Sequence, residues 1–287
     1  MASKQNLVPY LFLLPALSLL VVFNLIPTFA TIRESVFAQS FFSGEQVFVG
    51  LQNYRDLFNF SGFWRSMEVT LAFNLVVNPL QVALALGLAV LINQHVPGMI
   101  VFRSVFLLPV AVSINVTAIV WGLMLDQNAG LVNGILVALG LPRQPFLLSV
   151  DQALWSIIAI VSWKGIPFWT LFFLAGLQNI PHSVIEAAKI DGASTWAIFT
   201  RIKLPLLRPV IAFVLVADTI TNFTMFAPIF LLTRGGPQQT TNLIMHETYR
   251  RGFVYGDLST SSAMITVMLI LVIIIIAVQF ALLRPKT

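Results

Sequence analysis

Two ionisable residues, Lys164 and Asp218, lie inside long apolar runs of this 287-residue sequence. A charged side chain in the hydrocarbon core of a membrane is costly, and such residues usually face a water-filled cavity or one another. Four interpretations are open. The two residues form a structural ion pair, they line a path for a solute singly or as a pair, they extend to the membrane surface, or the span boundaries lie elsewhere. All four keep the charges out of the hydrocarbon.

Polar amides recur along a neighbouring apolar run. Asn74, Asn78 and Gln81 are spaced i, i+4 and i+7, so they form a stripe on one face of a helix. Such amides either bond to neighbouring helices or contact a solute, and their spacing does not separate the two. Asn115, in the next run along the chain, has the same two interpretations.

The residues needed for enzyme chemistry are missing or scattered. The sequence has no cysteine, which excludes a thiol nucleophile and a Cys-ligated metal. His95, His182 and His246 are far apart, without the spacing of metal ligands. No G-x-x-x-x-G-K-[ST] loop is present, so the chain lacks this motif for binding nucleotide phosphates. We therefore expect no metal and no cofactor on this chain, which is not an enzyme by itself.

The amino-acid composition indicates the environment in which these residues lie. Hydrophobic residues make up 58% of the chain and charged residues 9%, whereas soluble domains carry about 25% charged residues. The chain is therefore an integral membrane protein. The net charge of +5 comes without a clustered basic stripe and interleaved aromatics, so nucleic-acid binding is excluded.

A helix needs about 20 apolar residues to cross a membrane, and six segments meet this requirement. The first is too long for the apolar part of a signal peptide and has no clear cleavage site, so we expect it to be retained. The predicted fold is all-α, with one transmembrane domain over 1–287. The predicted spans cover roughly 7–32, 67–92, 101–125, 152–177, 207–232 and 261–283.

Basic residues predict the orientation of these spans. If both termini are cytoplasmic, the inside segments hold about as many Lys and Arg residues as the outer loops, but the inside segments are much shorter. Their basic density is therefore higher, and the positive-inside rule favours cytoplasmic termini.

Residues 178–206 form a polar loop between the fourth and fifth predicted spans. Pro181 ends the preceding pattern, and Ser183 with Glu186 has the spacing of a capping box. Gly192 is a natural helix stop. Ser194 or Thr195 then caps a second short helix, and Pro205 is expected to prevent its continuation into the fifth span. These signals predict two short helices joined by a tight turn at the cytoplasmic surface.

This loop has two interpretations: a connector whose apolar face lies on its own bundle, or a surface that docks into another protein. Small residues form a closely approachable patch beside charged ones. These residues are Ala187, Ala188, Gly192 and Ala193.

The loop resembles a known motif. Glu186-Ala187-Ala188, three residues, Gly192, nine residues and Ile202-x-Leu204-Pro205 are similar to the EAA motif of membrane subunits of binding-protein-dependent ABC importers. Asp191-Gly192-Ala193 is the variant usual in carbohydrate permeases. The resemblance extends over the whole chain through three further stretches, Phe48-Val49-Gly50-Leu51-Gln52-Asn53-Tyr54, Gly235-Gly236-Pro237 and Tyr249-x-x-Gly252-Phe253.

The resemblance implies a type I ABC importer permease, similar to maltose and glycerol-3-phosphate permeases, in a bacterial or archaeal cytoplasmic (inner) membrane. Its implied partners are a second homologous permease, two ATPase subunits that bind ATP and Mg, an extracytoplasmic substrate-binding protein and membrane lipid. Glu186 would pair with a basic residue of the ATPase. The implied coupling residues are Glu186, Ala187, Ala188, Asp191, Gly192 and Ala193.

The resemblance also implies a substrate pathway. Lys164-Gly165-x-Pro167-Phe168 matches the place where the maltose permease carries a substrate-contacting glycine and an aromatic residue. Trp121, Trp163, Phe168 and Trp169 could stack on sugar rings or serve as packing residues. The candidate pathway residues are Lys164, Gly165, Phe168, Asp218, Asn222, Met225, Asn78 and Asn115.

This sequence also departs from the maltose permease. Met225 replaces a polar amide, and the charges of Lys164 and Asp218 stand where that permease has uncharged groups. Maltose itself is therefore doubtful, and a glycosylated osmolyte or glycerol phosphate stays open. Asp218 disfavours an anion unless Lys164 offsets it, which favours a neutral sugar-like solute.

Two other classes of function stay open. In an ion-coupled secondary transporter, Lys164 and Asp218 would serve the coupling, but the inverted repeat expected in many such folds is not evident. In a purely structural membrane subunit, replacing either charge would leave uptake intact.

Overall fold

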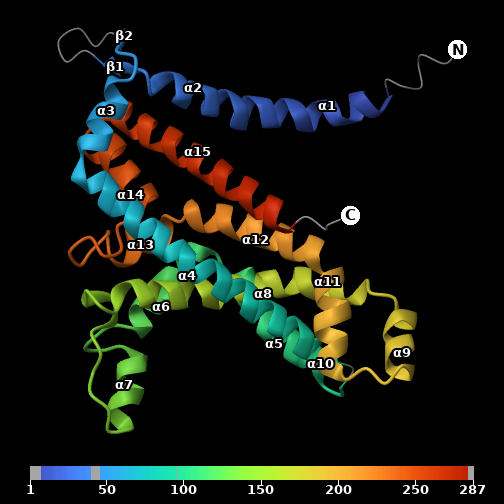
Figure 1. The fold of residues 1–287 in the computed structure, drawn as a ribbon. Helices are drawn as coiled ribbons and strands as arrows, with labels where there is room; N and C mark the ends of the chain where they lie inside the picture. The colour runs from blue at the N-terminus through green and yellow to red at the C-terminus, as the bar shows by residue number, and fades with distance from the viewer. Residues whose placement is uncertain (1–7, 40–45, 95, 284–287) are drawn as a thin grey trace, which may run out of the picture. The chain divides into compact units, whose positions relative to one another are not determined.

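The computed structural model describes residues 8–39, 46–94 and 96–283, and it is mostly helical (Figure 1). The chain forms two compact units. The first contains Met1–Trp64 and Thr248–Ile270, and the second contains Arg65–Glu247 and Leu271–Thr287. Two long helices, α4 (Ser61–Ile92) and α15 (Leu258–Leu283), contribute residues to both units.

The first unit begins with an apolar helical run. Tyr10–Glu34 is long enough to cross a membrane, and none of its most apolar window is buried within this chain. This agrees with the first predicted span. The run consists of α1 (Val8–Leu20), a π-helical segment (Val21–Leu25) and α2 (Ile26–Glu34), and it is followed by β1 (Phe37–Gln39), β2 (Gln46–Phe48) and α3 (Gln52–Asn59).

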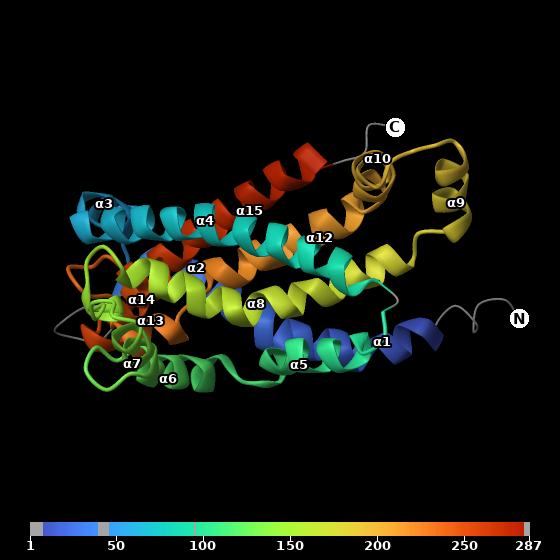
Figure 2. The same cartoon turned by 90° about the horizontal axis from the view of Figure 1, so that it is seen from below.

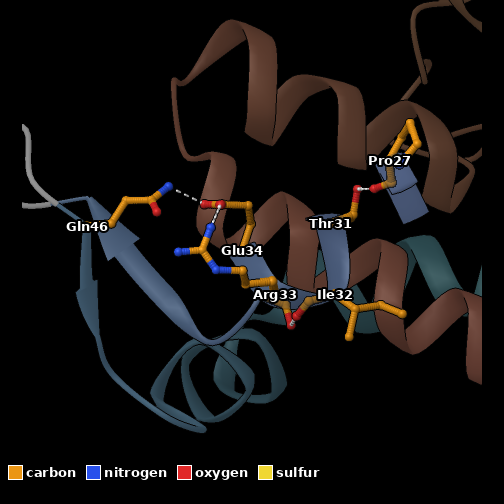
Figure 3. Close-up of polar contacts among 7 residues, drawn as sticks. Pro27, Thr31, Ile32, Arg33, Glu34 and Gln46 are labelled. Atoms are coloured by element: carbon orange, nitrogen blue, oxygen red, sulfur yellow. Dashed lines mark hydrogen bonds and ion pairs between the residues drawn. The ribbon is translucent and has the colours of Figure 1, made fainter. Parts of the chain in front are cut away.

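β1 and β2 form an antiparallel pair, and the end of α2 is tied to it. Glu34 accepts a 2.6 Å hydrogen bond from the Gln46 side chain and lies 3.6 Å from the Arg33 guanidinium (Figure 3). The Arg33 guanidinium also lies 4.9 Å from the centre of the Phe37 ring. These exposed contacts connect the end of α2 to β1 and β2.

The stretch from Phe48 to Tyr54 has a structural role. Asn53, buried at the start of α3, donates hydrogen bonds to the carbonyls of Ser35 and Phe37 at 2.8 and 2.9 Å. The Tyr54 hydroxyl lies 2.6 Å from Ser35 Oγ. Buried backbone carbonyls need such partners, so this stretch fastens the β pair to α3.

The second unit contains the elements that surround the site. Five helical runs in the described part of the chain could cross a membrane, or six if α5 and α6 count as one span. α4 and α15 begin a few residues before the predicted spans. Further elements of this unit are α5 (Met99–Ala111), α6 (Ile114–Met124), α7 (Leu131–Ala138), a 3₁₀ turn (Phe146–Leu148), α8 (Ala153–Gln178), α12 (Arg208–Phe223) and α13 (Ala227–Leu232). α14 (Ile244–Tyr249) has residues in both units, and the π-helical segment that follows it (Arg250–Val254) belongs to the first.

The third predicted span, over 101–125, is divided into two helices, because the chain turns by 99° between α5 and α6. Val112 and Ser113 adopt extended backbone angles there. The Ser113 side chain accepts a 3.3 Å hydrogen bond from the Val116 amide, so it caps the N-terminus of α6. A local cap thus starts a new helix inside an apolar run.

Residues 178–206 form the two short helices that the sequence predicts, α9 (His182–Ile190) and α10 (Thr195–Ile198). Gly192, at φ +77°, ends α9, and the Ala193 amide reaches back to the Ala188 carbonyl at 2.9 Å. This is the Schellman arrangement. Ser194 accepts from the Ala197 amide and caps α10.

Two details of this loop differ from the prediction. The capping box is absent because α9 begins at His182, after Pro181, which leaves Ser183 inside the first turn without a cap bond. Pro205 does not stop the helical backbone. It lies in α11 (Leu204–Leu206), which directly continues a π-helical segment (Phe199–Lys203) and ends before α12 begins at Arg208.

α8 packs against α5, α6 and α12, and α13 packs against α6 and α8. Ala85 and Ala89 of α4 are fully buried beside Phe173 of α8. Such small residues let membrane helices approach closely. Figures 1 and 2 show α7 and α9 at opposite ends of this unit.

Candidate functional site

A cavity of about 550 Å³ lies in the second unit, lined from α4, α5, α6, α8, α12 and α13. Its size is in the range of small-molecule sites, about 300–1,000 Å³. The break between α5 and α6 contributes Val110 and Ile114 to its wall. Six of the eight candidate pathway residues line it together: Lys164, Gly165, Phe168, Asp218, Asn222 and Met225.

The Asp218 carboxylate is held by two donors from different helices. Oδ1 accepts hydrogen bonds from Trp169 Nε1 at 2.7 Å and Asn222 Nδ2 at 3.0 Å. The side chain is 1% exposed. Among the described residues Oδ2 has no hydrogen-bond partner, although a buried acceptor without a partner costs about 1–3 kcal/mol. Asp218 therefore combines a place in the cavity lining with one buried acceptor oxygen that no described residue satisfies.

Lys164 makes no ion pair with Asp218 in the part of the chain that the structure describes. Its Nζ donates hydrogen bonds to the carbonyls of Pro109 and Val112. These carbonyls lie at the C-terminal end of α5, where helix carbonyls lack partners within the helix and a positive charge is favourable. The structural ion pair, one of the interpretations that the sequence left open, is therefore not formed. Lys164 instead binds the carbonyls at the C-terminal end of α5.

Asn78 lies behind the cavity wall rather than on it. It is 6% exposed, accepts a 2.8 Å hydrogen bond from Asn222 and lies 3.2 Å from the Thr219 hydroxyl. Asn78 therefore connects α4 to α12 through Asn222, which also donates to Asp218. Asn115 is exposed on α6 and does not line the cavity.

Aromatic side chains supply much of the apolar wall. Phe168, 40% exposed, meets Trp169 edge-on at 4.8 Å between ring centres, and both line the cavity. Trp121 and Trp163 contact each other at 5.7 Å and line other surfaces. Phe168 and Trp169 are thus the members of the predicted aromatic set that reach this cavity.

Two features of the site are not in the predicted set. Gln81 lines the cavity from α4, and its place in the Asn74, Asn78, Gln81 stripe could have indicated this. The hydrogen bond from Trp169 to Asp218 joins residues on two different helices and has no local signal in the sequence.

The predicted coupling surface lies on α9 and the turn after it. Glu186, Ala187, Asp191 and Gly192 are exposed, whereas Ala188 and Ala193 are half-buried. Two large apolar side chains beside them, Ile190 and Trp196, are 86% and 72% exposed.

The described residues contain no group of three or more His, Asp or Glu side chains that could hold a metal ion. The cavity instead combines a buried carboxylate, amides, hydroxyls and aromatic rings among apolar helices. These groups can bind a small polar solute within a membrane, so the fold and the cavity define a helical membrane protein with a solute-sized site.

Comparison with known proteins identifies the family. Residues 81–287 match the model of the binding-protein-dependent transport system inner membrane component. The chain is 37% identical to the trehalose/maltose transport system permease protein MalF of Thermococcus litoralis, over 92% of this chain and 89% of that protein. It is 35% identical to the sn-glycerol-3-phosphate transport system permease protein UgpA of Yersinia pestis, over 97% and 94%. The chain belongs to this family of inner-membrane permeases.

A solved structure supports the fold. The chain matches a chain of a bacterial alginate ABC transporter, crystallised with a periplasmic protein bound to an alginate pentasaccharide. The TM-score is 0.85 over 98% of this chain and 95% of that one, at 24% identity.

Proposed function

We propose that this chain forms half of the translocation pathway of an ATP-driven importer for a neutral sugar or sugar-like polyol. The whole chain acts as one permease domain. A second homologous permease supplies the other half of the pathway, and an extracytoplasmic binding protein delivers the solute. ATP and Mg bind to two partner ATPase subunits.

The observation that carries this proposal is the arrangement of Asp218, Lys164 and Phe168 in the cavity. Asp218 places a hydrogen-bond acceptor in the cavity lining, to which a solute hydroxyl can donate, and the half-exposed Phe168 places an aromatic ring there for contact with a sugar ring. Lys164 is already bonded to two backbone carbonyls. Because this cation is engaged elsewhere, the carboxylate disfavours a phosphate ester more than a neutral polyol.

Coupling is proposed to run through α9. Glu186 is exposed, and its carboxylate makes no cap bond within α9. It is therefore available to a basic residue of an ATPase subunit, and Ile190 and Trp196 provide apolar surface to bury in the same contact. For α9 to reach an ATPase subunit it must lie on the cytoplasmic side of the membrane, and we propose that both termini lie on that side as well.

The test is ATP hydrolysis by the purified complex in liposomes, with its binding protein, across trehalose, maltose, glycosylated polyols and sn-glycerol 3-phosphate. Stimulation by neutral sugars or polyols supports the proposal. Stimulation by glycerol phosphate alone would replace the substrate class. Uptake that continues without ATP or the ATPase subunits would instead indicate an ion-coupled transporter.

A further inference from the structure

Gly165 of α8 and Gln81 of α4 meet at the edge of the cavity, and both line it. A Cβ atom built on Gly165 would lie 2.5 Å from Gln81 Oε1 and 3.0 Å from Gln81 Cδ. Real Cβ atoms do not come so close to a neighbour. The Gln81 amide thus occupies the space that a side chain at position 165 would fill.

The Gln81 amide has unused hydrogen-bonding capacity. The side chain is 2% exposed, and Nε2 donates to Ser162 Oγ at 3.3 Å. No described residue donates a hydrogen bond to Oε1. A primary amide has two N–H donors and one carbonyl acceptor, so one donor and the acceptor remain beside the cavity. A hydroxyl both donates and accepts, and therefore matches this pair.

We propose that Gln81 is a specificity-determining residue that binds solute hydroxyls, and that Gly165 acts through Gln81 instead of contacting the solute. This inference rests on the proposed function, because it deepens the account of the same cavity. It also changes the role that the family resemblance implies for Gly165. The glycine is required because any side chain there would displace the amide.

The proposal predicts coupling between the two positions. In Gly165→Ala the new methyl group pushes the flexible end of Gln81 away from Ser162 and into the cavity, while the helices keep their places. We expect the uptake rate to fall about tenfold, the usual effect of one misplaced methyl-sized group in a binding pocket. In a Gln81→Ala background the same methyl group meets no amide, and the further change should stay within about twofold.

The experiment compares wild type, Gly165→Ala, Gln81→Ala and the double variant in the complete complex in liposomes. Initial uptake of labelled trehalose, maltose and sn-glycerol 3-phosphate is measured at saturating binding protein, so that the binding protein's own affinity does not limit the rate. Gly87→Ala is the matched control, because nothing lies within 4 Å of a Cβ atom at that position of α4. Complex yield and melting temperature are recorded for every variant.

Two outcomes of this cycle overturn the proposal. If Gly165→Ala lowers uptake by the same factor in both backgrounds, position 165 acts on the solute or the backbone directly. If Gly165→Ala transports like wild type, a side chain at position 165 does not affect transport through the Gln81 amide. The expected result is a loss with Gln81 present that disappears when Gln81 is already removed.

A second variant tests the amide without altering Gly165. Gln81→Leu keeps most of the volume and removes the polar atoms, and we expect it to lower uptake about tenfold. Wild-type uptake by Gln81→Leu would overturn the proposal even if Gly165→Ala failed to assemble. Failure of the proposed substrate class gives a different result, because wild-type protein would then transport glycerol phosphate and neither disaccharide. In that case the uptake rates of the four proteins are compared with glycerol phosphate as the solute.

Discussion

The indole Nε1 of Trp169 donates a 2.7 Å hydrogen bond to Oδ1 of Asp218, joining α8 to α12 at the cavity wall. Both side chains are buried, at 5% and 1% exposure. A ring that lines the cavity thus also sets the position of its carboxyl group. A shift of the indole would therefore remove one of the two donors to Asp218 Oδ1.

Trp169→Phe keeps the ring surface and removes the N–H donor. Loss of one such hydrogen bond costs about 1.5–3 kcal/mol when the acceptor is charged. If the placement of Asp218 limits transport, uptake at saturating binding protein should fall at least about tenfold. Trp163→Phe, on the same helix but outside this cavity, is the control. Equal effects of the two substitutions would show that the Trp169 N–H has no special role.

Lys164 and Asp218 line one cavity without pairing, which a double-mutant cycle can test. Lys164→Met removes the donor to the Pro109 and Val112 carbonyls, at a cost of about 1–3 kcal/mol. Asp218→Asn disturbs a separate set of contacts. The two losses of unfolding free energy should add to within about 0.5 kcal/mol. Thermal unfolding of the purified complex measures this, and a smaller cost of the second substitution would reveal an ion pair.

The Asn78 side chain should matter for stability through its bonds to α12. Asn78→Leu removes the hydrogen bonds to Asn222 and Thr219. Because a typical hydrogen bond contributes about 0.5–1.5 kcal/mol, we expect a loss of about 1–3 kcal/mol. Asn115→Ala changes an exposed amide and should alter stability by no more than about 0.5 kcal/mol, with uptake unchanged. Melting temperature and uptake check both variants. Loss of uptake in Asn115→Ala would place that residue back in the pathway.

The long apolar helices are predicted well from the sequence, because the length of an apolar run is a local property. The sequence predicts a span over 152–177, and α8 occupies Ala153–Gln178. Lys164 and Asp218 stood out for the same reason, since a charge in an apolar run is visible without a structure. Tertiary relationships were not predictable in this way. Trp169 meets Asp218 only because α8 packs against α12.

Local signals also compete, and the sequence does not say which one prevails. Ser113 starts a new helix inside the third apolar run, although hydropathy alone predicts a continuous span. Ser183 and Glu186 have the spacing of a capping box, but α9 already begins at His182. In each case a helix start shifted by a few residues changes the role of the side chains around it.

The last prediction follows from that shift and concerns Glu186. Because Glu186 makes no cap bond in α9, replacing it should leave the helix intact. Glu186→Gln and Glu186→Ala should therefore change the melting temperature little, corresponding to no more than about 0.5 kcal/mol. If its charge pairs with an ATPase subunit, both variants should lose that contact equally.

Measurement of solute-stimulated ATP hydrolysis separates the two roles. We expect Glu186→Gln and Glu186→Ala to reduce stimulation by a similar factor of about ten, since 1.4 kcal/mol of lost contact energy corresponds to a tenfold change. Ser183→Ala is the control and should behave like wild type, because Ser183 makes no cap bond. Wild-type stimulation in Glu186→Gln together with failure of Glu186→Ala would mean that a hydrogen bond, and not the charge, holds α9 to its partner.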